Sequence, residues 1–249
     1  ELSGNVVIAG STSVLPLSDT LAKAFTDSNP GVKIDVQGGG SGQGIKSLEE
    51  KIADFGSLSR EVKEEEKSVV QEEYVIAKDG IAVIVNNDQT TAVDLTLEQL
   101  KDIFTGNVTN WKDVGGDDTP IVVVAREEGS GTRDAFNELT GVMADDVDST
   151  AKAAIIQGST GAVAQTVAST KGSIGYISLG SLDDTVKAIS VAGVAPSKET
   201  VLDSTYKLSR PFLYVRGADL SPQAQAYLDF VLSADGQKIV EEEGFISAQ

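Results

Sequence analysis

Three short segments rich in glycine and hydroxyl side chains are the places where this sequence could bind an anion. Each follows an apolar run typical of a buried strand and precedes residues with helical spacing. The first turn of a helix leaves backbone N–H groups without intrahelical partners and carries partial positive charge. Glycine permits close backbone approach, while Ser and Thr hydroxyls add hydrogen-bond donors. These three anion cradles span residues 10–16, 38–44 and 126–133.

The alternative interpretation of each cradle is an ordinary helix N-cap, which favours the same residue types. Any one cradle alone is better explained by capping, but three in one chain, each after a strand, favour anion binding. Residues 39–44 have the glycine spacing of a Walker A loop, but Ile45 occupies the lysine position. Gln43 and Ile45 fall where a dinucleotide-binding G-x-G-x-x-G would need its last glycine, and Gln43 also breaks the hydrolase pattern G-x-S-x-G.

Arg126 is the cationic side chain best placed to contact a bound anion. It follows the apolar run 121–125, and a guanidinium can hold an oxyanion through two parallel hydrogen bonds. Glu128 lies two residues later, where we expect it to orient Arg126. The alternative is a surface Arg–Glu pair of little energetic value. Ser59 and Arg60 form a second candidate, for which the alternative is a loop end that caps the next helix.

These cradles need a scaffold that positions the ends of several strands. Apolar runs alternate with helically spaced apolar residues along the chain, which predicts an α/β fold with a mostly parallel sheet. The charged stretch 63–73 is interpreted as a solvent-exposed helix whose inner side carries Val69 and Val70. The other expected strands are 6–9, 32–36, 81–85, 121–125 and 174–178, and the other expected helices are 17–25, 45–52, 97–104, 134–139 and 222–232.

Composition excludes several classes of function. The chain of 249 residues has 38 acidic and 20 basic residues, and its net charge of -18 argues against binding to nucleic acid or anionic lipid. The lack of cysteine and histidine removes the usual zinc, copper and haem ligands and excludes Ser-His-Asp or Cys-His catalysis. No apolar run is long enough to span a membrane. We expect no catalytic residues, no metal and no cofactor, and we expect the chain to be a processed mature fragment.

Taken together, the motifs resemble those of the phosphate-binding proteins of bacterial phosphate ABC transporters. The resemblance covers nearly the whole chain, and its specificity lies in the order and spacing of the motifs. The motifs are Gly10-Ser11-Thr12-Ser13 with Pro16, Gly38-Gly39-Gly40-Ser41-Gly42, Ala53-Asp54-Phe55-Gly56 with Ser59-Arg60, Ile103-Phe104-Thr105-Gly106 with Asn110-Trp111, Arg126-Glu127-Glu128-Gly129-Ser130-Gly131-Thr132-Arg133, and Gly172-Ser173-Ile174-Gly175-Tyr176.

The resemblance implies a two-lobed periplasmic-binding-protein fold of type II. Each lobe would be an α/β sheet, two crossing strands would form a hinge, and the ligand would bind in the cleft between the lobes. We expect lobe I to comprise residues 1–83 and 211–249 and lobe II to comprise residues 84–210. The hinge crossings are expected near 81–85 and 212–215.

By the same resemblance, phosphate would be held mainly by neutral donors, with Arg126 paired to the anion. Glu128 would hold the Arg126 guanidinium, and Thr12 would support the first cradle. Well-studied members have an Asp where this chain has Ser59, and that carboxylate accepts a hydrogen bond from protonated phosphate, which sulfate cannot offer. A serine oxygen accepts more weakly, and Arg60 either adds charge to the site or points away from it. The implied ligands are Ser13, Val14, Leu15, Ser41, Ser59, Arg60, Arg126, Ser130, Gly131 and Thr132.

The implied function is that of a receptor rather than an enzyme: capture of inorganic phosphate outside the cell and its delivery to a membrane permease. We expect a monomer without nucleic-acid partners. It would be either a cell-surface lipoprotein, with its anchoring cysteine before Glu1, or a free periplasmic protein. Two alternatives stay open. One is a receptor for another tetrahedral oxyanion such as sulfate, and the other is a phosphate-ester hydrolase with a serine nucleophile and a lysine or carboxylate base.

Overall fold

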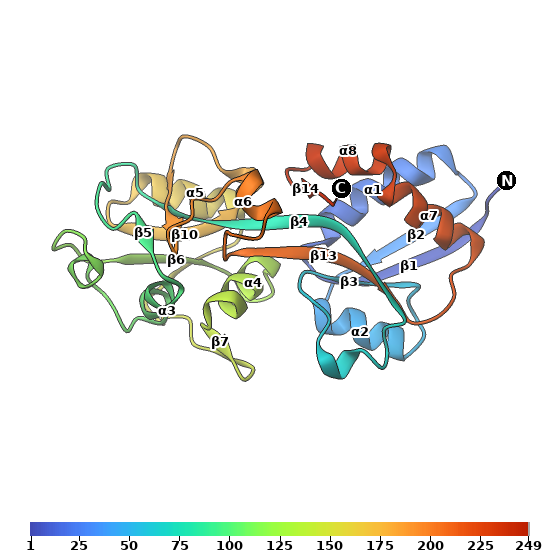
Figure 1. Ribbon diagram of the computed structural model, residues 1–249, viewed down its shortest axis with the longest axis horizontal. Coiled ribbons are helices and arrows are strands. Elements are labelled where there is room, and N and C mark those ends of the chain that lie inside the picture. The colour runs from blue at the N-terminus through green and yellow to red at the C-terminus, as the bar shows by residue number, and fades with distance from the viewer. Residues whose placement is uncertain (249) are drawn as a thin grey trace. The chain divides into compact units, whose positions relative to one another are not determined.

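The computed structural model describes residues 1–248, and the chain divides into two compact α/β units. Unit 1 comprises Glu1–Asp79 and Arg210–Gln249, and unit 2 comprises Gly80–Ser209. Two strands, β4 (Glu72–Val85) and β13 (Ser209–Arg216), each contribute residues to both units (Figure 1). The mixed α/β class predicted from the alternation of apolar runs and helical spacing is confirmed.

Unit 1 is built on a sheet with the order β2-β1-β3-β13. Strand β1 pairs in parallel with both β2 and β3, whereas β13 runs antiparallel to β3. Helices α1 and α2 each follow a parallel strand, so their N-termini lie at the carboxyl ends of β1 and β2. The elements are β1 (Gly4–Gly10), α1 (Leu15–Ser28), β2 (Val32–Gln37), α2 (Ser41–Glu49), β3 (Phe55–Leu58), α7 (Pro222–Leu232), α8 (Ala234–Glu242) and β14 (Ile246–Ser247), which pairs with β4.

A chain of three hydroxyl groups crosses the apolar core of unit 1. Ser18 Oγ lies 2.7 Å from the Tyr214 hydroxyl, which lies 3.0 Å from the Tyr227 hydroxyl. All three side chains are buried, and Phe25 and Phe55 pack against the tyrosine rings. Because each hydroxyl has a partner, the tyrosines add their aromatic area to the core without an unsatisfied polar atom.

This hydroxyl chain predicts loss of stability in alkali. Burial raises the pKa of Tyr214 from 10.0 to about 12 and the pKa of Tyr227 well above its ordinary value. The folded state therefore holds these protons more tightly than the unfolded state. Their contribution to stability is complete below about pH 10 and is lost as the pH rises through about 12. Urea unfolding followed by circular dichroism across this window should show the decline. Ionisation of all tyrosines near pH 10 in the folded protein would contradict it.

In unit 2, β10 lies between β4 and β6, with β9 beyond β6. Strand β10 is antiparallel to β4 and parallel to β6, and β6 is parallel to β9. Its elements are β5 (Asp94–Leu95), α3 (Leu97–Thr105), β6 (Val122–Arg126), α4 (Gly131–Thr140), β7 (Met143–Ala144), β8 (Val147–Asp148), β9 (Ile155–Gln157), α5 (Thr160–Ser169), β10 (Ser173–Ser178), β11 (Lys187–Ala188), β12 (Ser190–Val191) and α6 (Lys198–Leu202).

Three aromatic side chains form the part of the unit 2 core that lies behind α4. The rings of Phe136 and Tyr176 stack with centroids 4.3 Å apart, and Phe104 meets Phe136 edge-on at 4.6 Å. All three side chains are almost fully buried. This packing ties α3, α4 and β10 together and fixes the position of the N-terminus of α4.

The expected helix over 63–73 is wrong, although every other strand and helix predicted from the sequence is present. The structure has only a short 3-10 turn at Glu64–Glu66 before β4 begins at Glu72. Val69 and Val70 do pack inward, as expected, against the apolar cluster beside α2. Two adjacent β-branched residues disfavour a helix. The Gln71 N–H donates to the carbonyl of Arg216 in β13, so the backbone already pairs with a strand at Gln71. Among the described residues, no helix combines the length and apolar character needed to cross a membrane.

Candidate functional site

The first cradle lies between β1 and α1, and Ser11 organises it. Gly10 has φ +147°, and a Cβ there would collide with the Ser57 carbonyl, so this close approach of β1 to β3 requires glycine. Ser11 Oγ accepts hydrogen bonds from the N–H groups of Ser13 at 3.1 Å and Val14 at 3.3 Å. The Leu15 N–H donates to the Ser11 carbonyl at 3.1 Å. Three of the backbone donors in this cradle therefore have partners inside the loop.

The second cradle brings two predicted ligand residues together at the start of α2. The N-cap residue Gly40 has φ +106°, and in the described chain no side chain caps this helix. The Ser59 N–H donates to Ser41 Oγ at 3.1 Å, and the two hydroxyl oxygens lie 3.3 Å apart. Both serines are half-buried. The end of β3 thus places Ser59 directly beside the uncapped N-terminus of α2.

Arg60 points to a carboxylate rather than standing free to receive an anion. Its Nη1 lies 2.7 Å from Glu66 Oε1, and its Nη2 lies 3.0 Å from Glu66 Oε2. Burial acts to raise the pKa of Glu66, but hydrogen bonds from Arg60 and the Lys63 N–H outweigh it and hold that pKa below its ordinary value. This bidentate pair occupies both ends of the Arg60 guanidinium fork.

The third cradle follows β6 and opens α4. Ser130 is the N-cap residue: its Oγ accepts a hydrogen bond from the Arg133 N–H at 3.2 Å, and the side chain is buried. Gly131 and Thr132 form the first turn of α4 and are half-buried. This arrangement confirms a helix start at this position, where the N–H groups of the first turn and the peptide dipoles favour an anion.

Arg126 is held beside this helix start by Glu127, not by Glu128 as expected. Its Nε and Nη2 donate to the two oxygens of Glu127 at 3.1 and 2.9 Å. This pairing lowers the pKa of Glu127. Glu128 is exposed. A strand that continued past Arg126 would put residues 126 and 128 on one face. The strand ends at Arg126, and a turn closed by the Ser130 N–H and the Glu127 carbonyl redirects the chain.

Two further residues that hold Arg126 were not predicted as site residues. Its Nη1 donates to Thr160 Oγ1 at 3.3 Å, and its backbone N–H donates to the Tyr176 hydroxyl at 3.1 Å. Burial raises the pKa of Tyr176 from 10.0 to about 12, so the hydroxyl is neutral at physiological pH. A signal for Thr160 is present in the sequence, because residues 158–161 read Gly-Ser-Thr-Gly and precede α5 much as the other cradles precede their helices.

Arg133 supports the third cradle by linking the backbone of Arg126 to Asp148. Its Nη1 donates to the Arg126 carbonyl at 2.7 Å, while Nε and Nη2 donate to Asp148 Oδ2 at 3.1 and 2.8 Å. Burial acts to raise the pKa of Asp148, but hydrogen bonds from Thr150 and Arg133 outweigh it and lower that pKa. The charge of Arg133 is thus balanced by Asp148.

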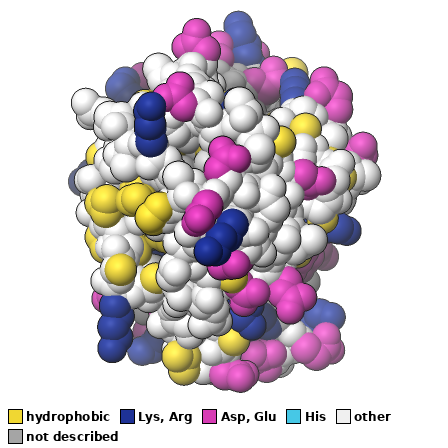
Figure 2. All heavy atoms as spheres, turned by 90° about the vertical axis from the view of Figure 1, so that its left-hand side faces the viewer, with side chains coloured by type: hydrophobic (Ala, Val, Ile, Leu, Met, Phe, Trp, Pro, Cys, Tyr) yellow, Lys and Arg dark blue, Asp and Glu magenta, His cyan; other side chains and the backbone are white. Residues whose placement is uncertain are grey.

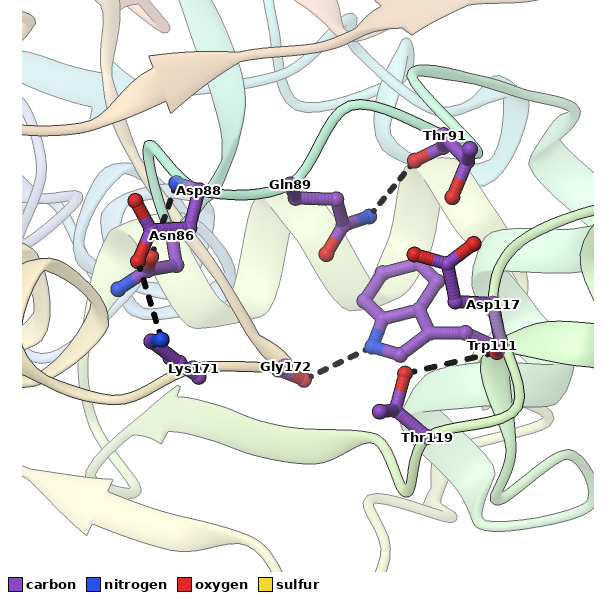
Figure 3. A pocket seen from close by; sticks show the side chains of 9 residues that line it. All are labelled: Asn86, Asp88, Gln89, Thr91, Trp111, Asp117, Thr119, Lys171 and Gly172. Carbon is purple, nitrogen blue, oxygen red and sulfur yellow. Dashed lines mark hydrogen bonds and ion pairs between the residues drawn. The ribbon is translucent and has the colours of Figure 1, made fainter.

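Two hollows lie away from these cradles. One, of about 220 Å³, lies in unit 2 next to Trp111, whose Nε1 donates to the Gly172 carbonyl at 2.9 Å (Figure 3). The other, of about 210 Å³, lies in unit 1 beside Asp54. Neither includes a predicted ligand residue. Acidic and basic side chains are interspersed over the face in Figure 2, so attraction for an anion would depend on the local donors of the cradles.

Comparison with known proteins places this geometry in a family. A profile described as a PBP superfamily domain matches residues 1–235. The "Phosphate-binding protein PstS" of Bacillus subtilis is 34% identical over 253 residues, which cover 99% of this chain and 81% of the relative. The Borreliella burgdorferi protein of the same name is 31% identical over 97% of this chain and 89% of the relative.

Two solved structures extend the similarity to the backbone. An ABC-type phosphate transport receptor from Vibrio cholerae superposes with a TM-score of 0.92 at 37% identity, covering 97% of this chain and 99% of the other. A phosphate ABC transporter substrate-binding protein from Clostridium perfringens, solved with bound phosphate, has a TM-score of 0.78 at 43% identity, covering 99% and 100%. With cradles in the family's order and these similarities along almost its entire length, the chain belongs to the PBP superfamily and, within it, to the PstS phosphate-binding protein family.

Proposed function

We propose that this protein is the extracytoplasmic substrate-binding component of an ABC transporter, which captures inorganic phosphate and delivers it to the membrane permease. The observation that carries the proposal is Arg126, which Glu127 and Thr160 fix at the end of β6, just before the loop that opens α4. A largely buried guanidinium followed by a helix N-terminus suits an anion site. The names of the relatives describe phosphate-binding proteins and transport receptors, not enzymes.

The proposed ligand contacts come from the cradles and from Ser59. In unit 2, Arg126 pairs with phosphate, and Ser130, Gly131 and Thr132 donate from the start of α4. In unit 1, the Ser13 and Ser41 hydroxyls donate, and Ser59 supplies an acceptor. The N–H groups of Val14 and Leu15 are assigned no phosphate contact, because they already donate to Ser11. Neutral hydrogen bonds then outnumber ion pairs, as the content of Ser, Thr and Gly in the cradles suggests. Arg60 is assigned no phosphate contact, because Glu66 engages both of its terminal nitrogens. In Arg126, by contrast, the carboxylate of Glu127 takes Nε and Nη2, and Nη1 faces the neutral hydroxyl of Thr160.

The direct test is calorimetric titration of ligand-stripped protein with phosphate, arsenate and sulfate at pH 5 and pH 8. We expect tight binding of phosphate and arsenate and no heat with sulfate. Comparable binding of sulfate would replace the phosphate receptor by a general receptor for tetrahedral oxyanions. Absence of heat with all three ions would overturn the proposal and return the cradles to ordinary helix caps.

Glu127 should support binding by orienting Arg126. Replacing Glu127 by Gln removes the charge of its partner while keeping its size, and we expect phosphate affinity to fall about three- to fivefold, the worth of one partly exposed ion pair. Glu128→Gln is the matched control, because it removes the same charge from the adjacent, exposed position. Titration of both variants with phosphate distinguishes them, and equal effects would remove Glu127 from this role.

Delivery to a permease requires the receptor to work at the outer face of the membrane, and this location is part of the proposal. A lipid anchor and a monomeric state stay predictions. Analytical ultracentrifugation of the purified chain with and without phosphate tests whether it is a monomer.

A further inference from the structure

A buried ion pair in unit 1 lies directly behind the first cradle. Arg210 in β13 and Asp79 in β4 each expose only 4% of their side chains, and Arg210 Nη2 lies 3.4 Å from Asp79 Oδ2. The guanidinium carbon lies 5.4 Å from the ring centroid of Phe212. Burying two charges costs solvation, so a buried ion pair is by itself weak evidence for stability. A role in the neighbouring cradle gives it a functional reason.

That role is visible in a second hydrogen bond of the same guanidinium nitrogen. Arg210 Nη2 lies 3.1 Å from Ser13 Oγ. Arginine has five N–H donors and no acceptor, so the direction of this bond is fixed: Ser13 Oγ accepts. The single hydroxyl proton of Ser13 must therefore point to another acceptor. The Ser13 N–H donates to Ser11 Oγ, so the backbone donor of this residue also has a partner within the protein.

We propose that Arg210 is a positioning residue of the phosphate site, which sets the Ser13 hydroxyl as a donor toward the bound anion. Asp79 holds Arg210 in the orientation that makes this contact. A hydroxyl that accepts from a cation is also polarised and becomes a stronger donor. This inference rests on the proposed function, because it assumes that Ser13 contacts phosphate.

The consequence for the ligand is that Ser13 favours a fully deprotonated oxygen of phosphate. The acceptor for the phosphate proton must then come from another residue, and the Ser41–Ser59 pair of the same unit is the candidate among the predicted ligands. Arg210 thus makes the Ser13 hydroxyl a donor to phosphate. In the Ser41–Ser59 pair, either hydroxyl can act as the donor or as the acceptor.

A double-mutant cycle on phosphate affinity tests this role. Asp79→Leu/Arg210→Met replaces the ion pair by apolar side chains, so that no lone charge is left buried. We expect this pair replacement and Ser13→Ala each to weaken phosphate binding about tenfold, the worth of one hydrogen bond to an ion. Combined, they should weaken it no more than Ser13→Ala alone, because Arg210 acts through the Ser13 hydroxyl. A combined loss of about a hundredfold, or no loss from the pair replacement, would overturn the inference.

Two further variants separate a positioning role from a structural one. Arg210→Lys keeps the charge beside Asp79 but lacks the fork, and it should lose several-fold affinity only while Ser13 is present; an equal loss in the Ser13→Ala background would also overturn the inference. Arg216→Met is the matched control, since Arg216 lies in the same strand but contacts Tyr74, and its phosphate affinity should be unchanged. If the unmodified protein binds no phosphate, the proposed function fails. If it binds phosphate and the cycle is additive, only the role of Arg210 fails.

Discussion

Replacement of Arg126 by alanine is expected to weaken phosphate binding by more than a hundredfold. Its side chain is 14% exposed, and removing one partner of a largely buried charge pair costs about 3 kcal/mol. Nearby cations cannot substitute, because Arg133 is tied to Asp148. The variant also leaves the Glu127 carboxylate without its arginine, which adds repulsion of the anion. Calorimetric titration with phosphate measures the loss.

Three companion variants make the Arg126 experiment specific. Arg126→Lys keeps the charge but not the bidentate geometry and should give an intermediate affinity. Arg126→Ala/Glu127→Ala removes the repelling carboxylate and should recover a small part of the loss. Lys171→Ala removes the same charge from an exposed position of unit 2, with 85% of the side chain accessible, and should leave affinity unchanged. An Arg126→Ala affinity within threefold of the original would remove Arg126 from the site.

The positions of the cradles could be predicted from sequence because each signal is local. An apolar run, a glycine-rich turn and helical spacing together specify a strand, a loop and a helix, and the structure confirms this order at β1–α1, β2–α2 and β6–α4. The fourth loop of this type, at 158–161, was missed because its strand β9 has only three residues and both of its isoleucines are exposed. A short run on a sheet edge gives little hydrophobic signal.

The partners of the site residues could not be predicted in the same way. Ser13 and Arg210 are separated by 197 positions, and Arg126 and Tyr176 by 50. These contacts depend on which strands are neighbours in the sheet, and the sequence pattern does not state strand order. The error at Glu128 is of a different kind. Glu128 lies two residues past the end of β6, where the backbone turns and side chains no longer alternate between the faces of the sheet.

Replacement of Ser59 by alanine is expected to abolish most of the discrimination between phosphate and sulfate. Ser41 Oγ accepts a hydrogen bond from the Ser59 N–H at 3.1 Å and has room to accept one from the Ser59 hydroxyl at 3.3 Å. When the Ser59 hydroxyl donates to Ser41, its lone pairs are free to accept the proton of phosphate, and the Ser41 hydroxyl donates to another phosphate oxygen. Sulfate carries no such proton at pH 5 or pH 8 and leaves the Ser59 acceptor facing an anionic oxygen.

The sizes of the two effects should differ between the ligands. Losing an acceptor for a buried proton costs about 1–3 kcal/mol, so Ser59→Ala should weaken phosphate binding about tenfold to a hundredfold. Sulfate loses no hydrogen bond, and its affinity should stay constant or rise. Titration of the Ser59→Ala protein with both anions gives the ratio directly. A parallel fall for phosphate and sulfate would mean that Ser59 acts as a donor or only supports α2.

Ser59→Asp provides the opposite change and completes the argument. A carboxylate accepts the phosphate proton more strongly than a hydroxyl and repels an unprotonated anion, so the preference for phosphate over sulfate should increase. The same carboxylate cannot donate to Ser41, which leaves the Ser41 hydroxyl directed by the backbone N–H of residue 59 alone. Phosphate affinity that does not rise in Ser59→Asp would place the acceptor elsewhere. A rise in phosphate affinity in Ser59→Asp, together with a gain of sulfate binding in Ser59→Ala, would identify position 59 as the acceptor for the proton of the ligand.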